Sequence, residues 1–226
     1  DLARRGLSGY VLKRGSPSCG MERVKLYRDD AAAFERAGVG LFARVLRETL
    51  PLLPVEEEER LDDPRRRDGF ITRVFAYRRF VALREMAPRP EDVVVFHAAH
   101  ESLLRAHRPA ACARLRRLAA QRPRGPLTAW LDRYGEGFMR ALRAPATRAR
   151  HVSVLRHIVD RFERRLPTAA TRELLGLIGD YAAGRVPLIV PITLINHQAT
   201  RLDVAPVRDQ VYLHPHPKEL MLRNHV

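Results

Sequence analysis

Hydrophobic residues recur at intervals of three and four through most of this chain, most regularly after residue 63. Side chains at this spacing share one face of an α-helix, so the pattern predicts a succession of amphipathic helices. We expect them over residues 63–87, 91–107, 110–121, 147–166 and 171–183, with one more after Pro126. Proline at the first helical position of the first span and glycine after the last one are usual at helix ends.

The first 62 residues follow a different pattern. Alternating apolar and polar residues predict two short strands, 9–13 and 23–27, and a helix over 38–50 follows them. The predicted apolar side of this helix consists of Leu41, Phe42, Val45 and Leu46. Two strands and a helix do not close a stable sheet alone. We therefore expect this segment either to pack on the rest of the chain or to continue a domain that begins upstream. The run Glu56–Glu59 is interpreted as an acidic surface stretch at its end.

These patterns predict a mainly α protein with two domains, a partial α/β segment over 1–62 and a helical domain over 63–226. The tail from residue 187 is apolar and interrupted by prolines, with a short helix expected at 193–198. The longest apolar run, 186–192, is far shorter than the roughly 20 residues that cross a bilayer, so we predict no membrane span. Two cysteines are too few for a disulfide framework, and we expect a reducing, cytoplasmic setting.

Positive charge is concentrated in the helical part. Residues 1–62 hold 11 basic and 11 acidic residues, whereas 63–226 hold 30 and 15, which places the whole net charge of +15 there. Within 105–172 the numbers are 17 and 4. A concentrated positive field attracts polyanions, and phosphate backbones are the commonest partner. We therefore predict that the helical domain binds nucleic acid, with a solvated charged surface as the alternative.

One predicted helix gives this basic surface a geometry. Over 147–166, helical spacing places Arg150, Arg161 and Arg164 within an arc of roughly 60°, opposite the apolar face. Guanidinium groups on a rigid helix follow phosphates and do not read bases. The predicted nucleic-acid-binding residues are Arg114, Arg116, Arg117, Arg148, Arg150, Arg161 and Arg164.

A short turn is the best local candidate for chemistry. Residues Ser16 to Gly20 read Ser-Pro-Ser-Cys-Gly, which places Cys19 among exposed backbone amides. That setting suits an iron or zinc ligand, and a small residue that merely fills a turn is the alternative. Cys112 lies in a predicted helix, and we expect a packed side chain there.

Three histidines share one face of the helix predicted over 91–107. At about 100° per residue, His97, His100 and His107 fall within an arc of roughly 80°, which suits a metal-binding or base-contacting cluster. The same face also carries apolar residues such as Phe96, and it offers no carboxylate to complete a ligand set. Packing into the core is therefore the alternative role.

Common catalytic motifs are missing from the sequence. It contains no GxSxG, HExxH, P-loop or GxGxxG pattern. Hydrolase, nucleotide triphosphatase and dinucleotide-binding interpretations therefore gain no support.

Several longer motifs carry a family resemblance. The sequence Phe96-His97-x-x-His100 with His107, the run Pro187–Leu194 and the segment from Gln210 to Asn224 resemble the YbgA-type domain of unknown function. Upstream, the turn from Ser16 to Gly20, the run 38–43 and the run 54–58 resemble the second half of the thiouracil desulfurase family. Proteins that combine both are similar to bacterial enzymes that remove sulfur from 4-thiouridine in tRNA.

This resemblance implies a mechanism and a set of site residues. In such enzymes three cysteines hold a four-iron four-sulfur cluster, whose free iron takes the thiocarbonyl sulfur while water replaces it to give uridine. Cys19 matches the last cluster cysteine, and Ser16 or Ser18 is implied to orient substrate or a proton. The helical domain is implied to hold tRNA, in agreement with the charge distribution.

The chain also departs from the family pattern. The other two cluster cysteines have no counterpart, Glu101 stands where a basic residue is usual, and Ser153 replaces an amide residue. Three hypotheses follow: an RNA desulfidase whose natural form holds a cluster, a tRNA-binding module without chemistry, and a metalloprotein built on the three histidines. We expect the chain alone to bind tRNA and to lack both the cluster and activity.

Overall fold

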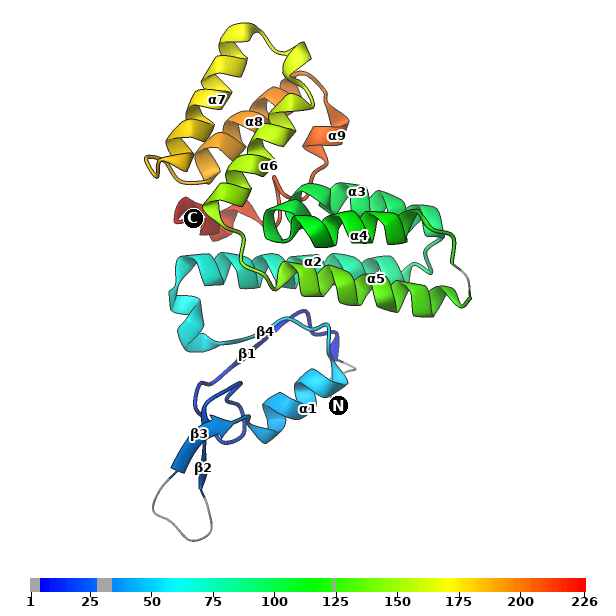
Figure 1. The fold of residues 1–226 in the computed structure, drawn as a ribbon, viewed down its shortest axis with the longest axis vertical. Helices are drawn as coiled ribbons and strands as arrows, with labels where there is room; N and C mark the ends of the chain where they lie inside the picture. Colours follow the sequence, from blue (N-terminus) through cyan, green and yellow to red (C-terminus); the bar gives the residue numbers. More distant parts are fainter. Residues whose placement is uncertain (1–4, 28–33, 124) are drawn as a thin grey trace. The chain divides into compact units, whose positions relative to one another are not determined.

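The computed structural model describes residues 5–27, 34–123 and 125–226. The chain forms two compact units, Asp1–Arg78 (the first unit) and Arg79–Val226 (the second unit). They divide inside the long helix α2 (Pro64–Glu85), whereas the predicted domain boundary lies at the start of that helix. Most of the described residues are helical, so the predicted mainly α class is confirmed (Figure 1).

The first unit is built from two short pairs of strands and one helix. Strand β1 (Tyr10–Leu12) pairs in parallel with β4 (Val55–Glu57), and β2 (Val24–Tyr27) pairs antiparallel with β3 (Phe34–Gly38). Helix α1 (Leu41–Thr49) follows β3, and the 3-10 helix η2 (Glu58–Asp62) leads from β4 into α2. The buried core of this unit consists of Leu12, Ala43, Leu46, Leu53 and Val55.

The structure corrects three predictions for this unit. Strands β3 and β4 were not predicted, and Glu56 and Glu57 belong to β4 rather than to a solvated acidic stretch. Helix α1 buries Ala43 and Leu46, whereas Leu41 and Val45 are 61% and 50% exposed. Ala43 and Leu46 share the core with Leu12 of β1 and Val55 of β4, so half of the predicted apolar side of α1 faces away from it.

The second unit consists of helices that pack in two connected groups. Helices α3 (Pro90–His107), α4 (Pro109–Ala120) and α5 (Leu127–Leu142) contact one another. Helix α6 (Arg148–Asp160) contacts α3 and also α7 (Thr168–Ala182), which contacts α8 (Ile189–Arg201), and α9 (Ala205–Arg208) follows (Figure 1). Aromatic rings fill the core beside α3 and α5, where the centroids of Phe80, Phe96, Tyr134 and Phe138 lie 5.2–6.3 Å apart.

Most predicted helices are confirmed, and two differ in length. Asp63 caps α2 as predicted, since its carboxylate accepts hydrogen bonds from the Arg65 and Arg66 amides at 2.8 and 3.2 Å. Helix α6 ends at Asp160 instead of residue 166. Pro167 disfavours helical backbone at the preceding residue, and the chain passes through the short 3-10 helix η3 (Glu163–Arg165) instead. Helix α8 is longer than predicted because Pro191 lies in its first turn, where no backbone donor is needed.

The C-terminal segment packs along α3. The Val211 amide donates a hydrogen bond to the Ala99 carbonyl at 2.9 Å, and the Gln210 side chain bonds the Ala98 carbonyl and the Ser102 amide. Two short 3-10 helices, η4 (Lys218–Leu220) and η5 (Leu222–Asn224), end the chain. Within the described ranges, no helix combines the length and the apolar character that a membrane crossing requires.

Candidate functional site

The turn from Ser16 to Gly20 lies between β1 and β2 and is closed by its own hydrogen bonds. The Ser16 carbonyl accepts from the Gly20 amide at 2.9 Å. The Ser16 hydroxyl oxygen accepts from the amides of Ser18 and Cys19, each at 3.4 Å. Serine side chains commonly close turns in this way. Here the bonds bring both serines beside Cys19.

Three polar side-chain atoms form a continuous chain on this turn. Ser16 Oγ lies 3.1 Å from Ser18 Oγ, which in turn lies 3.3 Å from Cys19 Sγ. Ser18 is exposed, Ser16 and Cys19 are half-buried, and the Cys19 thiol is free. The structure therefore brings the predicted catalytic and metal-ligating residues of this turn together. Two hydroxyls and a thiol in contact can bind a polar group and pass a proton between them.

Gly40 allows helix α1 to approach the turn. The amide of Gly40, the cap of α1, donates to the Gly20 carbonyl at 2.8 Å, and Ala43 donates to the Ser18 carbonyl at 3.2 Å. A β-carbon at Gly40 would lie 2.4 Å from the Ser18 carbonyl, closer than any real contact. Any larger residue at this position would push the helix and the turn apart. The turn is thus fixed against the start of α1.

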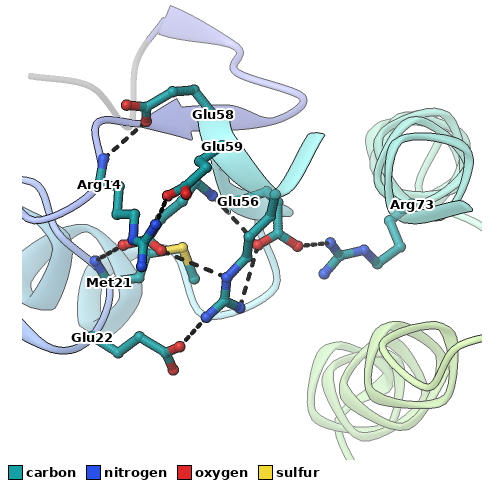
Figure 2. A network of polar contacts seen from close by, with 9 residues as sticks. Arg14, Met21, Glu22, Glu56, Glu58, Glu59 and Arg73 are labelled. Carbon is teal, nitrogen blue, oxygen red and sulfur yellow. Dashed lines mark hydrogen bonds and ion pairs between the residues drawn. The ribbon is translucent and has the colours of Figure 1, made fainter. Parts of the chain in front are cut away.

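A network of charged residues holds both sides of the turn (Figure 2). The Glu57 carboxylate, which is buried, accepts a hydrogen bond from the Met21 amide at 2.8 Å. Arg14 pairs with Glu59, and its amide donates to Glu58 at 2.9 Å. Further ion pairs join Arg60 to Glu22, Glu56 and Glu57, and Arg73 to Glu56.

This network gives the run Glu56–Glu59 a positioning role that the sequence interpretation missed. Arg14 precedes the turn and Met21 follows it, so carboxylates of the run are bonded on both sides of Cys19. A hollow of about 380 Å³ lies within the network, and its walls carry arginines and carboxylates. Val55 and Glu57 stand two residues apart, so a strand places both side chains on the same side. A carboxylate beside an apolar residue on that side was the signal in the sequence, because a buried carboxylate requires a partner.

The iron–sulfur cluster implied by the family resemblance needs more ligands than the structure brings together. Cys19 is the one cysteine in the sequence of the first unit. In the part of the chain that the structure describes, no group of three or more histidines, cysteines or carboxylates is placed to hold a metal ion. Burial raises the pKa of Cys112 to about 11, which disfavours the thiolate that ligates metals. The residues present supply one ligand, Cys19, and do not fit a complete cluster.

The three histidines of α3 are core residues. His97 Nδ1 lies 3.0 Å from the Tyr134 hydroxyl, and His107 Nδ1 lies 2.6 Å from the Ala144 carbonyl. His100 Nδ1 lies 2.8 Å from the Phe96 carbonyl, and the two rings stack with centroids 4.0 Å apart. All three side chains are buried. Their placement agrees with the packing alternative and gives the metal hypothesis no ligand set among the described residues.

Burial also keeps two of these histidines uncharged. It lowers the pKa of His100 to about 3, and it lowers the pKa of His97 as well. The Nε2 atoms of both rings have no hydrogen-bond partner among the described residues. Neutral imidazoles packed against aromatic rings stabilise a core, and they do not supply protons at neutral pH.

The seven predicted arginines divide into two groups. Arg148 lies over the Tyr181 ring at 5.3 Å, and Arg150 donates to the carbonyls of His107 and Pro145 at 2.9 and 3.1 Å. These two side chains brace the second unit. The other five are exposed and have neither an ion pair nor a side-chain hydrogen bond to a described residue: Arg114, Arg116, Arg117, Arg161 and Arg164.

The prediction that Arg150, Arg161 and Arg164 share one helix face is wrong for Arg164. Helix α6 ends at Asp160 with Arg161 as its cap residue, and Arg164 lies in the separate 3-10 helix η3. The sequence interpretation also missed Arg133 and Arg140 on α5, which are exposed and similarly unpaired among the described residues. Their spacing of seven residues, two helical turns, is the signal that would have placed them on one face.

Two family models match separate parts of the chain. Residues 102–217 match the family described as protein of unknown function (DUF1722), and residues 1–58 match 2-thiouracil desulfurase. The chain is also similar to the uncharacterized protein YbgA of Escherichia coli (strain K12). The two are 23% identical over 158 residues, which cover 70% of this chain and 94% of that protein. No solved structure matches the chain.

The first of these matches spans more than half of the 226 residues and includes α4 to α9 with their unpaired arginines. The second includes the Ser16–Gly20 turn, helix α1 and strand β4, and it relates the first unit to desulfurase-type function. By the extent of the first match, the chain belongs to the DUF1722 family of proteins of unknown function.

Proposed function

We propose that this chain is the tRNA-binding part of a desulfidase that converts 4-thiouridine to uridine. The second unit holds the tRNA through its unpaired arginines, and the first unit contributes Cys19, Ser16 and Ser18 to the desulfurating site. The match of residues 1–58 to 2-thiouracil desulfurase supports the sulfur chemistry, because thiouracil and 4-thiouridine both carry a thiocarbonyl group on a pyrimidine ring.

One observation carries the RNA-binding part of this proposal. The net charge of +15 lies entirely after residue 62, and many of the arginines there have no carboxylate partner among the described residues. Unpaired guanidinium groups on helices make an electrostatic surface that neutralises phosphates and releases their counterions. Such binding depends weakly on sequence, since phosphate contacts carry no base information.

A salt series of tRNA binding tests the proposal. A plot of the logarithm of the binding constant for tRNA against the logarithm of the salt concentration should fall linearly. Each neutralised phosphate should contribute about 0.7–0.9 to the magnitude of its slope. A slope with a magnitude of three or more is expected from five exposed, unpaired arginines of the second unit, namely Arg114, Arg133, Arg140, Arg161 and Arg164. Undetectable binding, or an affinity that does not change with salt, would contradict the proposal.

The sulfur chemistry needs ligands beyond those of this chain. One thiolate does not retain four irons, so anaerobic reconstitution with iron and sulfide should leave the purified chain without a stoichiometric cluster. Iron analysis and absorbance measure this, with the Cys19→Ser variant as the matched control. Four irons per chain, lost in the variant, would contradict the expectation and assign cluster binding to Cys19 of this chain.

A second candidate function is an RNA-binding module without chemistry. The observation that favours it is the single cysteine of the first unit. The two functions differ in their use of the turn. The test supplies the missing cysteine ligands of a four-iron cluster from outside the chain. A desulfidase should then release sulfide from 4-thiouridine in tRNA, and Cys19→Ser should abolish that release. A pure binding module should release no sulfide with or without these added ligands.

A further inference from the structure

A groove runs between α4 and α5 in the second unit. Its hollow measures about 220 Å³, and arginines line both sides, with Arg108 and Arg114 from the α4 side and Arg133 and Arg140 from α5. We propose that this groove binds an unpaired nucleotide segment of RNA, with phosphates on the arginines and a base on the floor. The inference rests on the proposed function and deepens it by naming a site and a class of RNA.

The arginines of this groove are not neutralised by the protein. All four are exposed, and none has an ion pair or a side-chain hydrogen bond to a described residue. Of the two carboxylates on α5, Asp132 pairs with Arg84 at 2.7 Å, and Glu136 is exposed without an ion pair among the described residues. Residues 108–142 contain eight arginines and these two acids. A positive field of this density attracts a polyanion.

The floor of the groove is apolar and narrow. A β-carbon at Gly137 would lie 2.8 Å from the Leu115 side chain, so the glycine allows the α5 backbone to lie close to α4. The floor consists of Ala111, Leu115, Leu118, Gly137 and Ala141. Pockets that enclose a small molecule usually measure about 300–1,000 Å³. This smaller hollow therefore suits one flat group that is held at its edges by charge.

The groove continues toward the connection between the two helices. Arg133 also lines a second hollow of about 570 Å³, together with Arg122 and Trp130. The Trp130 ring is buried, and its indole nitrogen donates to the Leu118 carbonyl at 3.3 Å. A chain of phosphates that enters between Arg114 and Arg140 therefore meets further cations at Arg133 and Arg122.

The chemistry of the lining favours an unpaired nucleotide over a duplex. Guanidinium groups pair with phosphate oxygens through two parallel hydrogen bonds and also stack on the faces of bases. A duplex offers phosphates alone to such a surface because its bases are stacked inside. An unpaired base can lie on the apolar floor between the arginines, as bases do in other single-strand sites.

The α4 helix supplies its own control. Arg116 and Arg117 are exposed on the same helix, and neither lines the groove. Around the helix axis, each of these two arginines points at least about 100° away from both Leu115 and Leu118, which line the groove. A diffuse basic surface would use Arg116 and Arg117 equally, whereas a groove site uses Arg114 and not these two.

Two triple variants of the full chain test the site. The groove variant carries Arg114→Gln, Arg133→Gln and Arg140→Gln, and the control carries Arg116→Gln, Arg117→Gln and Arg172→Gln. Both lose three exposed charges, and circular dichroism melts confirm that both fold. The probe is a labelled single-stranded RNA dodecamer, measured by fluorescence anisotropy over a salt series, with its own duplex as the second probe.

The groove variant should lose about 2 from the magnitude of the log–log salt slope for single-stranded RNA, since each phosphate contributes about 0.7. The salt slope of the control variant should change by less than the contribution of one phosphate, about 0.7. Equal losses in both variants would overturn the groove while leaving RNA binding by the second unit intact. Wild-type chain that binds no RNA would overturn both proposals. Polyglutamate that competes as well as RNA would overturn the assignment to a nucleotide.

A lysine variant separates charge from stacking. Arg114→Lys, Arg133→Lys and Arg140→Lys keep the charge but remove the planar group that stacks on bases. This variant should keep the wild-type salt slope and lose the preference for single-stranded RNA over duplex. An unchanged preference would overturn the placement of a base on the groove floor.

The chain's single tryptophan reports the position of the bound RNA. Trp130 shares the second hollow with Arg133, so single-stranded RNA in the groove should change its fluorescence. The change should saturate with the anisotropy signal in the wild type and disappear in the groove variant. Binding without any change in fluorescence would place the RNA elsewhere and overturn the groove.

Discussion

The two units contain similar kinds of charged residue and use them in opposite ways. In the first unit, Arg14, Arg60 and Arg73 all form ion pairs with the run Glu56–Glu59, and the turn that carries Cys19 is held between them (Figure 2). In the second unit, arginines along α4 and α5 have no carboxylate partners among the described residues. Arginine acts as a structural clamp around the turn of the first unit and as an unpaired field along α4 and α5 of the second.

The difference shows what a local charge balance can predict. Over 1–62 the numbers of basic and acidic residues are equal, and Arg14 and Arg60 form ion pairs with carboxylates of the same segment. Over 105–172 the excess is 13 positive charges, and most of the arginines that the structure describes there have no ion pair. A protein gains little stability from an exposed ion pair, so leaving these guanidinium groups unpaired costs the fold little and keeps them available to a ligand.

Acid should produce the largest difference between the units, because all nine histidines lie after residue 96. The pKa of His100 is about 3 in the folded chain and about 6.5 when unfolded. The unfolded state therefore binds a proton that the folded state does not, and stability falls as the pH drops below 6.5. Between pH 6.5 and 4.5 the second unit should lose about 2 kcal/mol from His100 alone.

Hydrogen exchange by mass spectrometry measures this loss unit by unit. Peptides of α3 and α5 should exchange faster as the pH falls, after correction for intrinsic rates, before those of the first unit do. His100→Asn should remove the contribution of one proton from the pH dependence of exchange. His197→Asn, at an exposed position, should leave that pH dependence unchanged. Simultaneous opening of both units would contradict the assignment of the acid sensitivity to the buried histidines.

Removing the buried carboxylate of Glu57 should loosen the turn in the first unit. Glu57→Ala leaves the Met21 amide without its acceptor, which costs about 2 kcal/mol. Exchange of the amides from Ser16 to Met21 should then accelerate roughly 30-fold. Glu48→Ala, on the exposed side of α1, serves as the control and should change little. If the two variants exchange alike, the carboxylate does not hold the turn.

A smaller effect separates bonded from unpaired arginines within the second unit. Arg150 donates to two carbonyls, so Arg150→Gln should lower the free energy of unfolding by about 1.5 kcal/mol. Arg117→Gln removes an unpaired exposed side chain and should stay within about 0.5 kcal/mol of the wild type. Urea titrations of both variants measure the difference. Equal stabilities of the two variants would mean that the hydrogen bonds of Arg150 do not stabilise the second unit.

The sequence predicted helices better than strands for a physical reason. Helical periodicity is local, and the six predicted helices appear as α2 to α7. Strand β4 was missed because it has only three residues, and because buried Glu57 is satisfied by an amide 36 positions away. Helix α8 was underestimated because Pro191 reads as a breaker, although a proline in the first turn interrupts no hydrogen bond.

The candidate sites divide in the same way. Ser16, Ser18 and Cys19 lie within four residues, so their contact follows from a single turn that the sequence displays. The α4–α5 groove combines residues from two helices, and its shape depends on the close approach at Gly137. Helical spacing placed Arg114 on a surface, but it did not indicate which helix faces it. Packing between elements supplies that information.

An arginine footprint tests the central claim that the unpaired arginines of the second unit hold RNA. The full chain is treated with phenylglyoxal, with and without saturating tRNA, and each modified arginine is identified by mass spectrometry. Bound tRNA should protect Arg114, Arg133 and Arg140 at least several-fold and leave Arg44 and Arg47, on the exposed side of α1, unprotected. Equal protection of both groups, or protection confined to the first unit, would contradict the account.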